Sequence, residues 1–354
     1  MDKFVRNLLT EWRKLGLPFS GETFVVAVSG GADSLSLALS LHELKKRKKL
    51  ENRYIVAHFN HGLRGKYSDD DEQFIKNLAA EFGFELAVKR GEIGNLKGNL
   101  EQNARNARYR FLNETAGRIN AVGILTAHTL NDQAETFLMN LVRGSGLKGL
   151  GGMRQIRESQ IIDQNQTDIK RSSYRRAGNY AVPVIRPLLT WATREMTEKY
   201  CIERGTEFRY DSMNDDLAFQ RVRIRKVLMP LLKDFNPKII EGIAATSFLL
   251  QEEFDALEEM FNANSTESSG SLSSRIKEEL EIKELKKMPF PIRRKIVREW
   301  LKRNRGNLRS LDIKHADAIE NLIFSRKSGK TVELPGASFV FKENGKLLYI
   351  EKKS

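Results

Sequence analysis

Between about residues 23 and 140 the chain alternates short apolar runs with longer segments of helical periodicity. The apolar runs cover residues 23–28, 54–59, 85–88 and 122–128, and segments such as residues 35–47 and 137–142 place apolar residues about every 3.6 positions. This alternation predicts a parallel sheet covered by helices, because parallel strands need helical crossovers. Ligands bind at the carboxyl ends of the strands in such sheets, so the residues directly after each run are candidates for a binding site.

The rest of the chain follows other patterns. Residues 154–181 are polar and basic without periodicity, which favours a long loop, whereas residues 182–189 are apolar again and residues 193–205 form a helical pattern that ends at Gly205. From Phe219 onward the patterns are helical, with a Ser-rich connection at residues 262–274 and a closing stretch, residues 330–352, that alternates around Pro-Gly and Asn-Gly turns. We therefore expect an α/β domain over residues 1–215, a Rossmann-like parallel sheet with helices on both faces. A mainly helical domain with a terminal β-hairpin is expected over residues 216–354.

Charge and composition limit the kinds of binding partner and the cellular location that we expect for the chain. Lys and Arg number 60 against 46 Asp and Glu, a net charge of +14. Between Pro291 and Arg309 the cations include Arg293 and Arg294, and Glu299 is the one acid, a density suited to nucleic acid, although a single basic run can also be a solvated helix face. The one cysteine can form no internal disulfide or thiolate cluster. No apolar stretch approaches the roughly 18 residues of a membrane span, and no secretory signal is evident, so we expect a cytoplasmic protein without a membrane anchor.

The run that ends at Val28 leads directly into the sequence SGGADS, residues 29–34, and then into a predicted helix. Two glycines let the backbone approach an anion, and the amino terminus of the helix directs unpaired N–H groups towards it. The two serines add hydroxyl donors, and Asp33 can hold a Mg²⁺ ion that bridges phosphate oxygens. The loop lacks the GKS or GKT sequence of a Walker-type kinase or GTPase, which excludes those classes. Because Gly-Gly turns are common after strands, the interpretation depends on the strand–loop–helix context.

SGGADS resembles the PP-loop of the ATP-pyrophosphatase superfamily, whose members cleave ATP between its α and β phosphates and adenylate an oxygen of their substrate. Four further segments resemble one family of this superfamily, the tRNA(Ile)-lysidine synthetases: AHFNHGLRG from Ala57, ARNARYRFL from Ala104, AHTLNDQAETFLMNLVRGSGLKGLGGM from Ala127, and RPLL from Arg186 followed by DSMND from Asp211. These segments cover about the first 215 residues. QRVRIRKVLMPLL from Gln220 and LPGASFVF from Leu334 resemble the family's carboxyl-terminal region more weakly. The chain departs from the family pattern at Val222, where asparagine is common, and at Met213, where proline is usual.

The resemblance implies a reaction and a set of site residues. In that family ATP, with Mg²⁺, adenylates the C2 carbonyl oxygen of the wobble cytidine in tRNA(Ile) with a CAU anticodon, and the ε-amine of free L-lysine displaces AMP. ATP would contact Ser29, Gly30, Gly31, Ala32, Asp33, Ser34 and His58, with Mg²⁺ on Asp33. The catalytic set would be Asp33, Arg108, His128, Asp132 and Glu135, of which Arg108 and His128 act on the adenylate and Asp132 and Glu135 bind lysine. Contacts to tRNA would come from Arg143, Lys148, Arg221, Arg225, Arg294 and Arg298, and a homodimer is left open.

These assignments have alternatives. Asp132 and Glu135 could serve only as first-turn acids that favour a helix amino terminus. His58, His61 and His128 could suggest zinc, because HFNH has a possible ligand spacing, but no fourth ligand is evident. Arg64 could reach a phosphate or be a solvated surface residue. A tRNA base thiolase would share the adenylation step but needs catalytic cysteines or an iron–sulfur cluster. A non-catalytic RNA-binding module would have no need of the three carboxylates.

Overall fold

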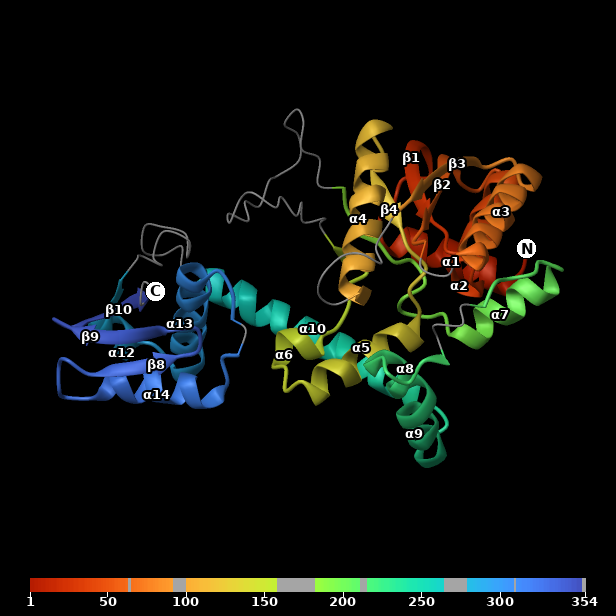
Figure 1. The fold of residues 1–354 in the computed structure, drawn as a ribbon. Coiled ribbons are helices and arrows are strands. Elements are labelled where there is room, and N and C mark those ends of the chain that lie inside the picture. Colours follow the sequence, from red (N-terminus) through yellow and green to blue (C-terminus); the bar gives the residue numbers. More distant parts are fainter. Residues whose placement is uncertain are drawn as a thin grey trace. The chain divides into compact units, whose positions relative to one another are not determined.

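The computed structural model describes residues 1–62, 65–91, 100–157, 182–210, 215–263, 279–308 and 310–351. They fall into two compact units, Met1–Phe254 and Asp255–Ser354, with the boundary inside helix α10 (Ile239–Ala263) (Figure 1). The expected boundary at residue 215, between an α/β domain and a mainly helical domain, stays a prediction. Most of the stretches 154–181 and 262–274, both expected to be connections, lie outside the described residues, as do residues 64 and 211–214. Among the helices of the described part, none combines the length and the apolarity that crossing a bilayer demands.

The first unit is built on a six-stranded sheet in the order β3-β2-β1-β4-β6-β5. The strands β1 (Ser20–Ala27), β2 (Glu51–Asn60), β3 (Glu85–Arg90), β4 (Gly123–Leu125) and β6 (Val184–Ile185) run parallel, and β5 (Ile156–Arg157) pairs antiparallel with β6. This confirms the predicted parallel sheet and adds β5, which at two residues is too short to leave a pattern. Strands β2 and β4 flank β1, so the order of connection reverses beside β1. The carboxyl ends of β1 and β4 therefore border the crevice where sheets of this type bind ligands.

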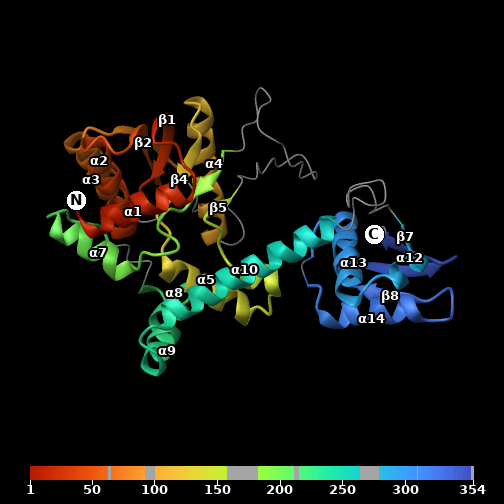
Figure 2. The same cartoon turned by 180° about the vertical axis from the view of Figure 1, so that it is seen from behind.

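Alternate side chains of β1 separate the two faces of this sheet. Phe24 and Val26 pack with residues of α1 (Lys3–Lys14), α2 (Ala32–Lys46), α3 (Lys66–Glu81) and α7 (Arg194–Glu203), and Val25 packs with α4 (Leu100–Arg118). Successive residues of a strand point to opposite faces, so one apolar run fills both layers of the core. Figures 1 and 2 show α4 on one side of the strands and α1 to α3 on the other.

A helical layer follows the sheet within the first unit. It contains α5 (Leu130–Val142), α6 (Leu147–Leu150), α8 (Gln220–Arg223), the π-helical turn η2 (Ile224–Leu228), α9 (Met229–Phe235) and α10. Leu138, Ile224 and Ile243 belong to its apolar core. The buried Gln133 of α5 ties the layer together, because its Nε2 donates to Ser247 Oγ (2.8 Å) and to the carbonyl oxygen of Gly151 (3.0 Å). These bonds join α5 to α10 and to the end of α6.

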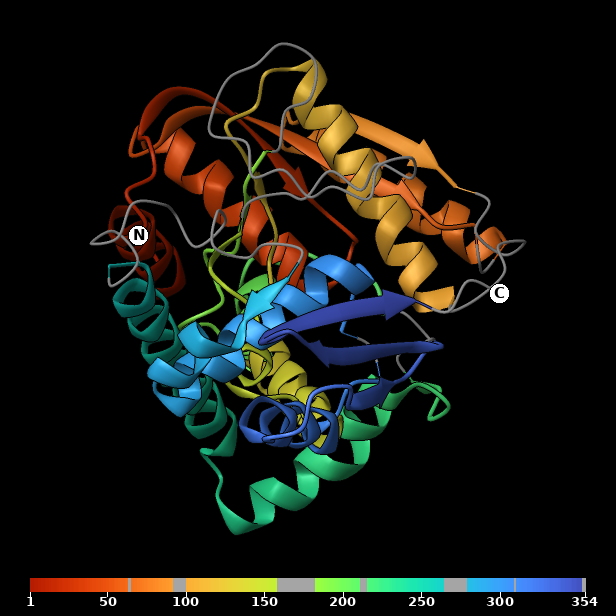
Figure 3. The ribbon, with the colours of Figure 1, turned by 90° about the vertical axis from the view of Figure 1, so that its left-hand side faces the viewer.

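The second unit is a small α+β structure. Its antiparallel sheet has the order β7-β10-β9-β8, from β7 (Leu280–Glu281), β8 (Thr331–Leu334), β9 (Ser338–Glu343) and β10 (Lys346–Glu351). Helices α12 (Ile282–Lys287), α13 (Phe290–Arg305) and α14 (Ile313–Phe324) share one apolar core with these strands, and the fully buried Trp300 of α13 belongs to it. Figure 3 shows the helices and strands of this unit in blue. The expected hairpin is β9–β10, whose turn places Asn344 and Gly345 at φ 47° and 77°. Strands β7 and β8 extend it to four strands, more than the sequence indicated.

Candidate active site

A cavity of about 580 Å³ opens at the carboxyl ends of β1, β2 and β4. Its wall comes from the loop after β1, the end of β2, the residues after β4, and helices α4, α5, α7 and α8. Of the residues singled out from the sequence, the wall contains Ser29, Gly31, Ala32, Asp33, Ser34, His58, Arg108, His128, Asp132, Arg221 and Arg225. The structure thus brings Asp132 and most of the expected nucleotide residues into one space, whereas Gly30 and Glu135 do not line it.

The SGGADS loop turns sharply between β1 and α2. Gly30 has φ +97°, a conformation that side chains rarely adopt, whereas Gly31 caps α2 at φ −75° and needs no glycine for its backbone. The Ser34 hydroxyl accepts from Ser29 N (3.1 Å) and donates to the Gly31 carbonyl oxygen (2.9 Å), which closes the loop on itself. The backbone of Arg209 also donates to the Gly30 carbonyl oxygen (2.9 Å). The first-turn N–H groups of α2 therefore border the cavity in a fixed arrangement that suits an anion.

Asp33 lies in the first turn of α2, where Thr197 donates a hydrogen bond to its Oδ1 and Arg194 Nε lies 3.9 Å from its Oδ2. Burial, together with the negative charge of Asp132, raises the pKa of Asp33 to about 6. Two carboxylates that raise each other's cost of ionisation offer a place for a cation. The described residues hold no group of three or more His, Cys, Asp or Glu side chains placed to bind a metal. A Mg²⁺ ion here would therefore complete its coordination with phosphate oxygens and water, as Mg²⁺ commonly does.

Two histidines contribute neutral rings to the cavity wall. His58 Nδ1 lies 2.9 Å from the Val28 carbonyl oxygen and so donates to it, and its buried Nε2 has no hydrogen-bond partner among the described residues. His128 Nδ1 lies 3.0 Å from Thr126 Oγ1. Burial and the charges of neighbouring arginines, Arg186 foremost, hold the pKa of His128 well below its ordinary value. Both rings can exchange hydrogen bonds with a ligand, but neither adds positive charge near neutral pH.

Asp132 has two partners. Its Oδ2 accepts from the backbone N–H of Thr129 (3.0 Å), which caps α5, and its Oδ1 accepts from Arg221 Nη2 (3.0 Å). Burial opposes ionisation of this carboxyl, but the charge of Arg221 outweighs it and holds the pKa of Asp132 below its ordinary value. The helix-capping role that the sequence left open is therefore present, and the same carboxylate also faces the cavity.

Glu135 lies behind the cavity wall and is 2% exposed. Its carboxylate accepts from Arg221 Nε (2.8 Å) and from Arg225 Nε (2.7 Å) and Nη2 (3.0 Å), and Arg194 Nη2 lies 3.4 Å away. Burial raises the pKa of Glu135, but the hydrogen bond from Arg225 and the nearby cations outweigh it, so the carboxyl is ionised. Two of the arginines expected to bind tRNA therefore contact the carboxylates expected to bind lysine: Arg221 contacts both of them, and Arg225 contacts Glu135.

The remaining expected residues lie elsewhere. In the first unit, Arg143 is exposed and donates to Gln220 Oε1 (3.1 Å), and Lys148 lies over the Phe254 ring (5.7 Å to its centroid). In the second unit, Arg294 pairs with Asp317 and Arg298 is exposed.

Arg293 corrects the view of this basic run as a charged outer face. It is 6% exposed, pairs with Glu320 and donates to the Met288 carbonyl oxygen (2.8 Å). Arg293 therefore lies on the inward face of α13, and its contacts stabilise the second unit.

Sequence reasoning missed three residues beside the loop: Arg194, Thr197 and Arg209. Arg194 and Thr197 contact Asp33 from α7, and Arg209 covers the Gly30 turn. For Arg194 and Thr197 the sequence holds one signal: residues 193–205 form a helix after the last parallel strand, so the first turn of that helix lies at the ligand-binding end of the sheet.

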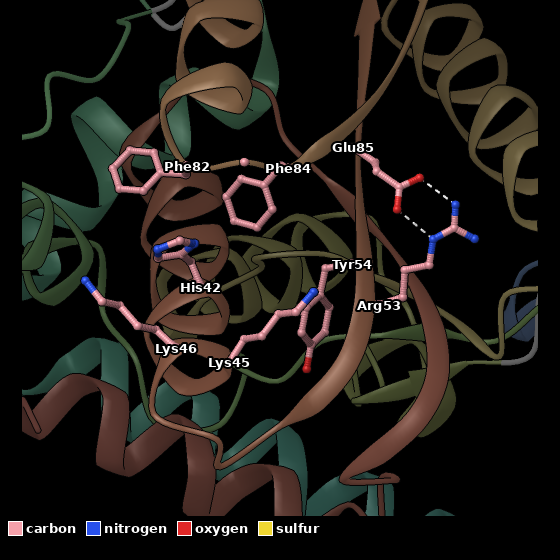
Figure 4. Close-up of a pocket in the computed structure, with 9 residues that line it drawn as sticks. His42, Lys45, Lys46, Arg53, Tyr54, Phe82, Phe84 and Glu85 are labelled. Atoms are coloured by element: carbon pink, nitrogen blue, oxygen red, sulfur yellow. Dashed lines mark hydrogen bonds and ion pairs between the residues drawn. The ribbon is translucent and has the colours of Figure 1, made fainter.

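A second, smaller cavity of about 280 Å³ lies at the opposite ends of β2 and β3 (Figure 4). His42 packs edge-on against Phe82 and Phe84, with ring centroids 5.3 and 5.7 Å apart, and Arg53 pairs with Glu85. It contains none of the residues singled out from the sequence, so the larger cavity is the candidate active site.

The chain is similar to known proteins over most of its length. Residues 3–232 match a family model described as a PP-loop domain, and residues 280–348 match the TilS substrate binding domain. The chain is 32% identical over 331 residues to the tRNA(Ile)-lysidine synthase of Dehalococcoides mccartyi (91% of this chain, 65% of that protein) and 33% over 328 residues to that of Geobacter sulfurreducens (89% and 62%). It thus spans less than two thirds of those two relatives. The Synechocystis synthase, 32% identical over 331 residues, is matched over 93% of this chain and 92% of its own length. Among solved structures, the U34-tRNA thiolase NcsA from Methanococcus maripaludis has a TM-score of 0.53 at 18% identity over 70% of this chain and 79% of its own, a likeness of fold alone.

Proposed function

The chain belongs to the tRNA(Ile)-lysidine synthase family, and on this basis we propose that it forms lysidine at the wobble cytidine of a tRNA(Ile) with a CAU anticodon. ATP adenylates the C2 carbonyl oxygen of that base, and the ε-amine of free L-lysine then displaces AMP. The observation that carries the proposal is one cavity whose wall contains both the SGGADS loop and Asp132. We place the reaction in the cytoplasm, where tRNA, ATP and lysine are available together.

In the first half-reaction the cytidine oxygen attacks the α-phosphorus and pyrophosphate leaves. The N–H groups at the start of α2 hold the β and γ phosphates. Mg²⁺ held by Asp33 would neutralise the charge of the departing pyrophosphate. The Nε2 atom of His58 accepts a hydrogen bond from the nucleoside of ATP. Arg108 offsets the charge that develops on the α-phosphate.

In the second half-reaction the lysine amine must be held as an ammonium and then lose a proton, since its ordinary pKa is about 10.4. Asp132 faces the cavity and binds the ammonium. Glu135 contributes negative charge from behind the wall. The neutral amine attacks C2, the C2–N bond forms, and the C2–O bond to AMP breaks. Asp132 accepts the proton that the ammonium loses, and the neutral ring of His128 lies beside the adenylate that leaves as AMP.

The arginine contacts suggest how the two halves follow one another. Arg221 contacts Asp132, and both Arg221 and Arg225 contact Glu135. Phosphates of a bound tRNA would compete for the Arg221 guanidinium and so free Asp132 for lysine, while Glu135 keeps its charge behind the wall. Lysine should therefore bind more tightly in the presence of the tRNA. Equal lysine affinity with and without tRNA would contradict this exchange.

Other exposed cations extend the proposed tRNA surface. They are Arg143 and Lys148 in the first unit and Arg298 in the second, where the half-buried Arg294 is a further candidate.

A base thiolase, the function named for the structural neighbour, is not favoured. Cys201, the one cysteine of the sequence, is buried in α7, and burial raises the pKa of its thiol to about 12. It therefore offers no thiolate for sulfur transfer.

The proposal is tested by product analysis with ATP, Mg²⁺ and unmodified tRNA bearing a CAU anticodon. Pyrophosphate release should require this tRNA, and AMP release should also require lysine. ADP or phosphate as the product, or turnover that is independent of the tRNA, would contradict the proposed reaction.

A further inference from the structure

The guanidinium groups near the cavity fall into two sets. Those of Arg194, Arg221 and Arg225 contact carboxylates. A second set, named here the arginine cluster, lies around the ring of Tyr109, which is 8% exposed, and consists of Arg105, Arg108, Arg157 and Arg186. The Cζ atoms of Arg105, Arg108 and Arg157 lie 5.1, 5.4 and 5.5 Å from the centroid of that ring. Within the described part of the chain no Asp or Glu pairs with any of them.

The arginine cluster carries positive charge, part of it buried, that the described residues do not balance. Arg186 is 1% exposed, and its Nε, like that of Arg108, has no hydrogen-bond partner among the described residues. Burial lowers the pKa of both Arg105 and Arg186, and the neighbouring guanidinium groups add to this effect. Burial raises the pKa of Tyr109, yet the four cations outweigh it and lower that pKa to about 8. Buried charge of one sign is costly unless a counter-charge accompanies it, so this arrangement suits an anion.

The fold brings the cluster together from three elements beside the crevice. Arg105 and Arg108 lie on α4, Arg157 ends β5, and Arg186 directly follows β6. Arg157 and Arg186 lie on adjacent segments of the backbone, because Arg157 is the register partner of Val184 and Arg186 N donates to the Gln155 carbonyl oxygen (2.8 Å). The pairing of β5 with β6 therefore sets the backbone positions of both arginines.

We propose that the arginine cluster is a phosphate site separate from the SGGADS loop, and that it holds a backbone phosphodiester of the substrate RNA beside the nucleotide being modified. This rests on the proposed function, because a base that enters the cavity carries its own phosphates with it. Planar guanidinium groups match the two free oxygens of a phosphodiester.

The extent of the cluster favours RNA over the phosphates of ATP. Arg105 and Arg108 line the cavity, whereas Arg157 is exposed at the surface. A polymer needs a cationic path from the cavity to the surface. The phosphates of ATP already have the loop, the start of α2 and, at the α-phosphate, Arg108, and they end inside the cavity.

The test compares Arg105→Gln and Arg157→Gln with Arg110→Gln, a matched loss of one charge from an exposed position of α4. Affinities are measured for unmodified CAU tRNA, ATP and inorganic pyrophosphate. Each cluster variant should weaken tRNA binding about tenfold or more. The slope of log affinity against log salt should become shallower by roughly 0.7–0.9 per lost contact. ATP and pyrophosphate affinities should stay within about twofold, and Arg110→Gln should change none of the three.

Three outcomes would overturn the proposal: weaker pyrophosphate or ATP binding with unchanged tRNA binding, no change in any affinity, or an equal effect of Arg110→Gln. Since Arg157 is exposed, its variant should keep the wild-type unfolding temperature, which guards against misfolding as the cause. Binding is measured without turnover, so the two proposals can fail separately. A protein that binds tRNA through the cluster but transfers no lysine refutes the proposed function alone. A protein that transfers lysine with unchanged tRNA affinity in both variants refutes the cluster alone.

Discussion

Replacing Asp33 with asparagine should stabilise the ligand-free protein at neutral pH and abolish adenylation. The carboxyl is ionised in water above a pKa of 3.8, but in the folded protein its pKa is about 6, chiefly because of burial and then because of Asp132. The folded state therefore binds the proton more tightly than the unfolded state. Stability falls as the pH rises from about 4 through 6, and the full cost of the charge is present above that window. Asparagine removes this cost because it has no charge to bury.

The size of the effect follows from the pKa difference. About 2 pKa units correspond to about 3 kcal/mol at 1.36 kcal/mol per unit. The Asp33 side chain is 27% exposed, and asparagine loses the attraction to Arg194, so the expected gain is smaller, about 1–2 kcal/mol. For a unit of this size that is a rise of a few degrees in unfolding temperature.

The assay is thermal unfolding of both proteins at pH 4 and pH 7.5 without nucleotide, paired with pyrophosphate release at pH 7.5. The variant should gain stability over wild type only at the higher pH and should lose pyrophosphate release by at least about 100-fold. A variant less stable than wild type at pH 7.5, or a difference independent of pH, would refute the electrostatic reasoning. Near-normal pyrophosphate release would refute the role in binding Mg²⁺.

Asp132→Asn and Glu135→Gln should raise the lysine requirement and slow lysine transfer more than adenylation in single-turnover experiments; equal slowing of both steps would point to a structural or nucleotide role. Glu135→Gln should also destabilise the first unit by about 3 kcal/mol, measured by urea unfolding, because it leaves buried guanidinium groups without their counter-charge. In the second unit, Arg298→Gln should weaken tRNA binding and flatten its salt dependence more than Arg294→Gln, whose guanidinium is already paired with an acid, and ATP affinity should not change; an unaltered slope for both would mean a merely solvated face. Lys342→Met should lower the stability of that unit by about 1–3 kcal/mol, because the Lys342 ammonium donates to three carbonyl oxygens at the end of α14, the shortest at 2.6 Å; hydrogen exchange in α14 and β9 as slow as in wild type would contradict this.

The fold could be predicted where the sequence pattern is long and periodic. Apolar runs separated by helical spacing located β1, β2, β3 and the helices between them, and the Asn344-Gly345 turn located the hairpin. The two-residue strand β5 could not be predicted, since its pairing is set by β6 and not by its own residues. Local sequence pattern therefore predicts the longer strands and helices, whereas contacts between distant segments determine a short strand such as β5.

The same division applies to the site. The SGGADS loop and Asp132 each follow a strand, so their meeting at one edge of the sheet follows from the order of elements alone. The contacts of Arg221 and Arg225 with Glu135 join residues 86 and 90 positions apart through the packing of α8 and η2 on α5. No spacing in the sequence encodes that packing, so sequence reasoning assigned these arginines a partner but could not find the carboxylates they contact.

The central claim is that this cavity joins lysine to a tRNA base. The direct measurement is incubation of the protein with ATP, Mg²⁺, labelled L-lysine and unmodified tRNA(Ile) bearing a CAU anticodon, followed by digestion of the tRNA to nucleosides. We expect one label per modified tRNA, located in the wobble nucleoside, and much slower labelling when Asp132 is replaced by asparagine. Labelled lysine that stays entirely free while pyrophosphate is released, or label at another nucleoside, would contradict it.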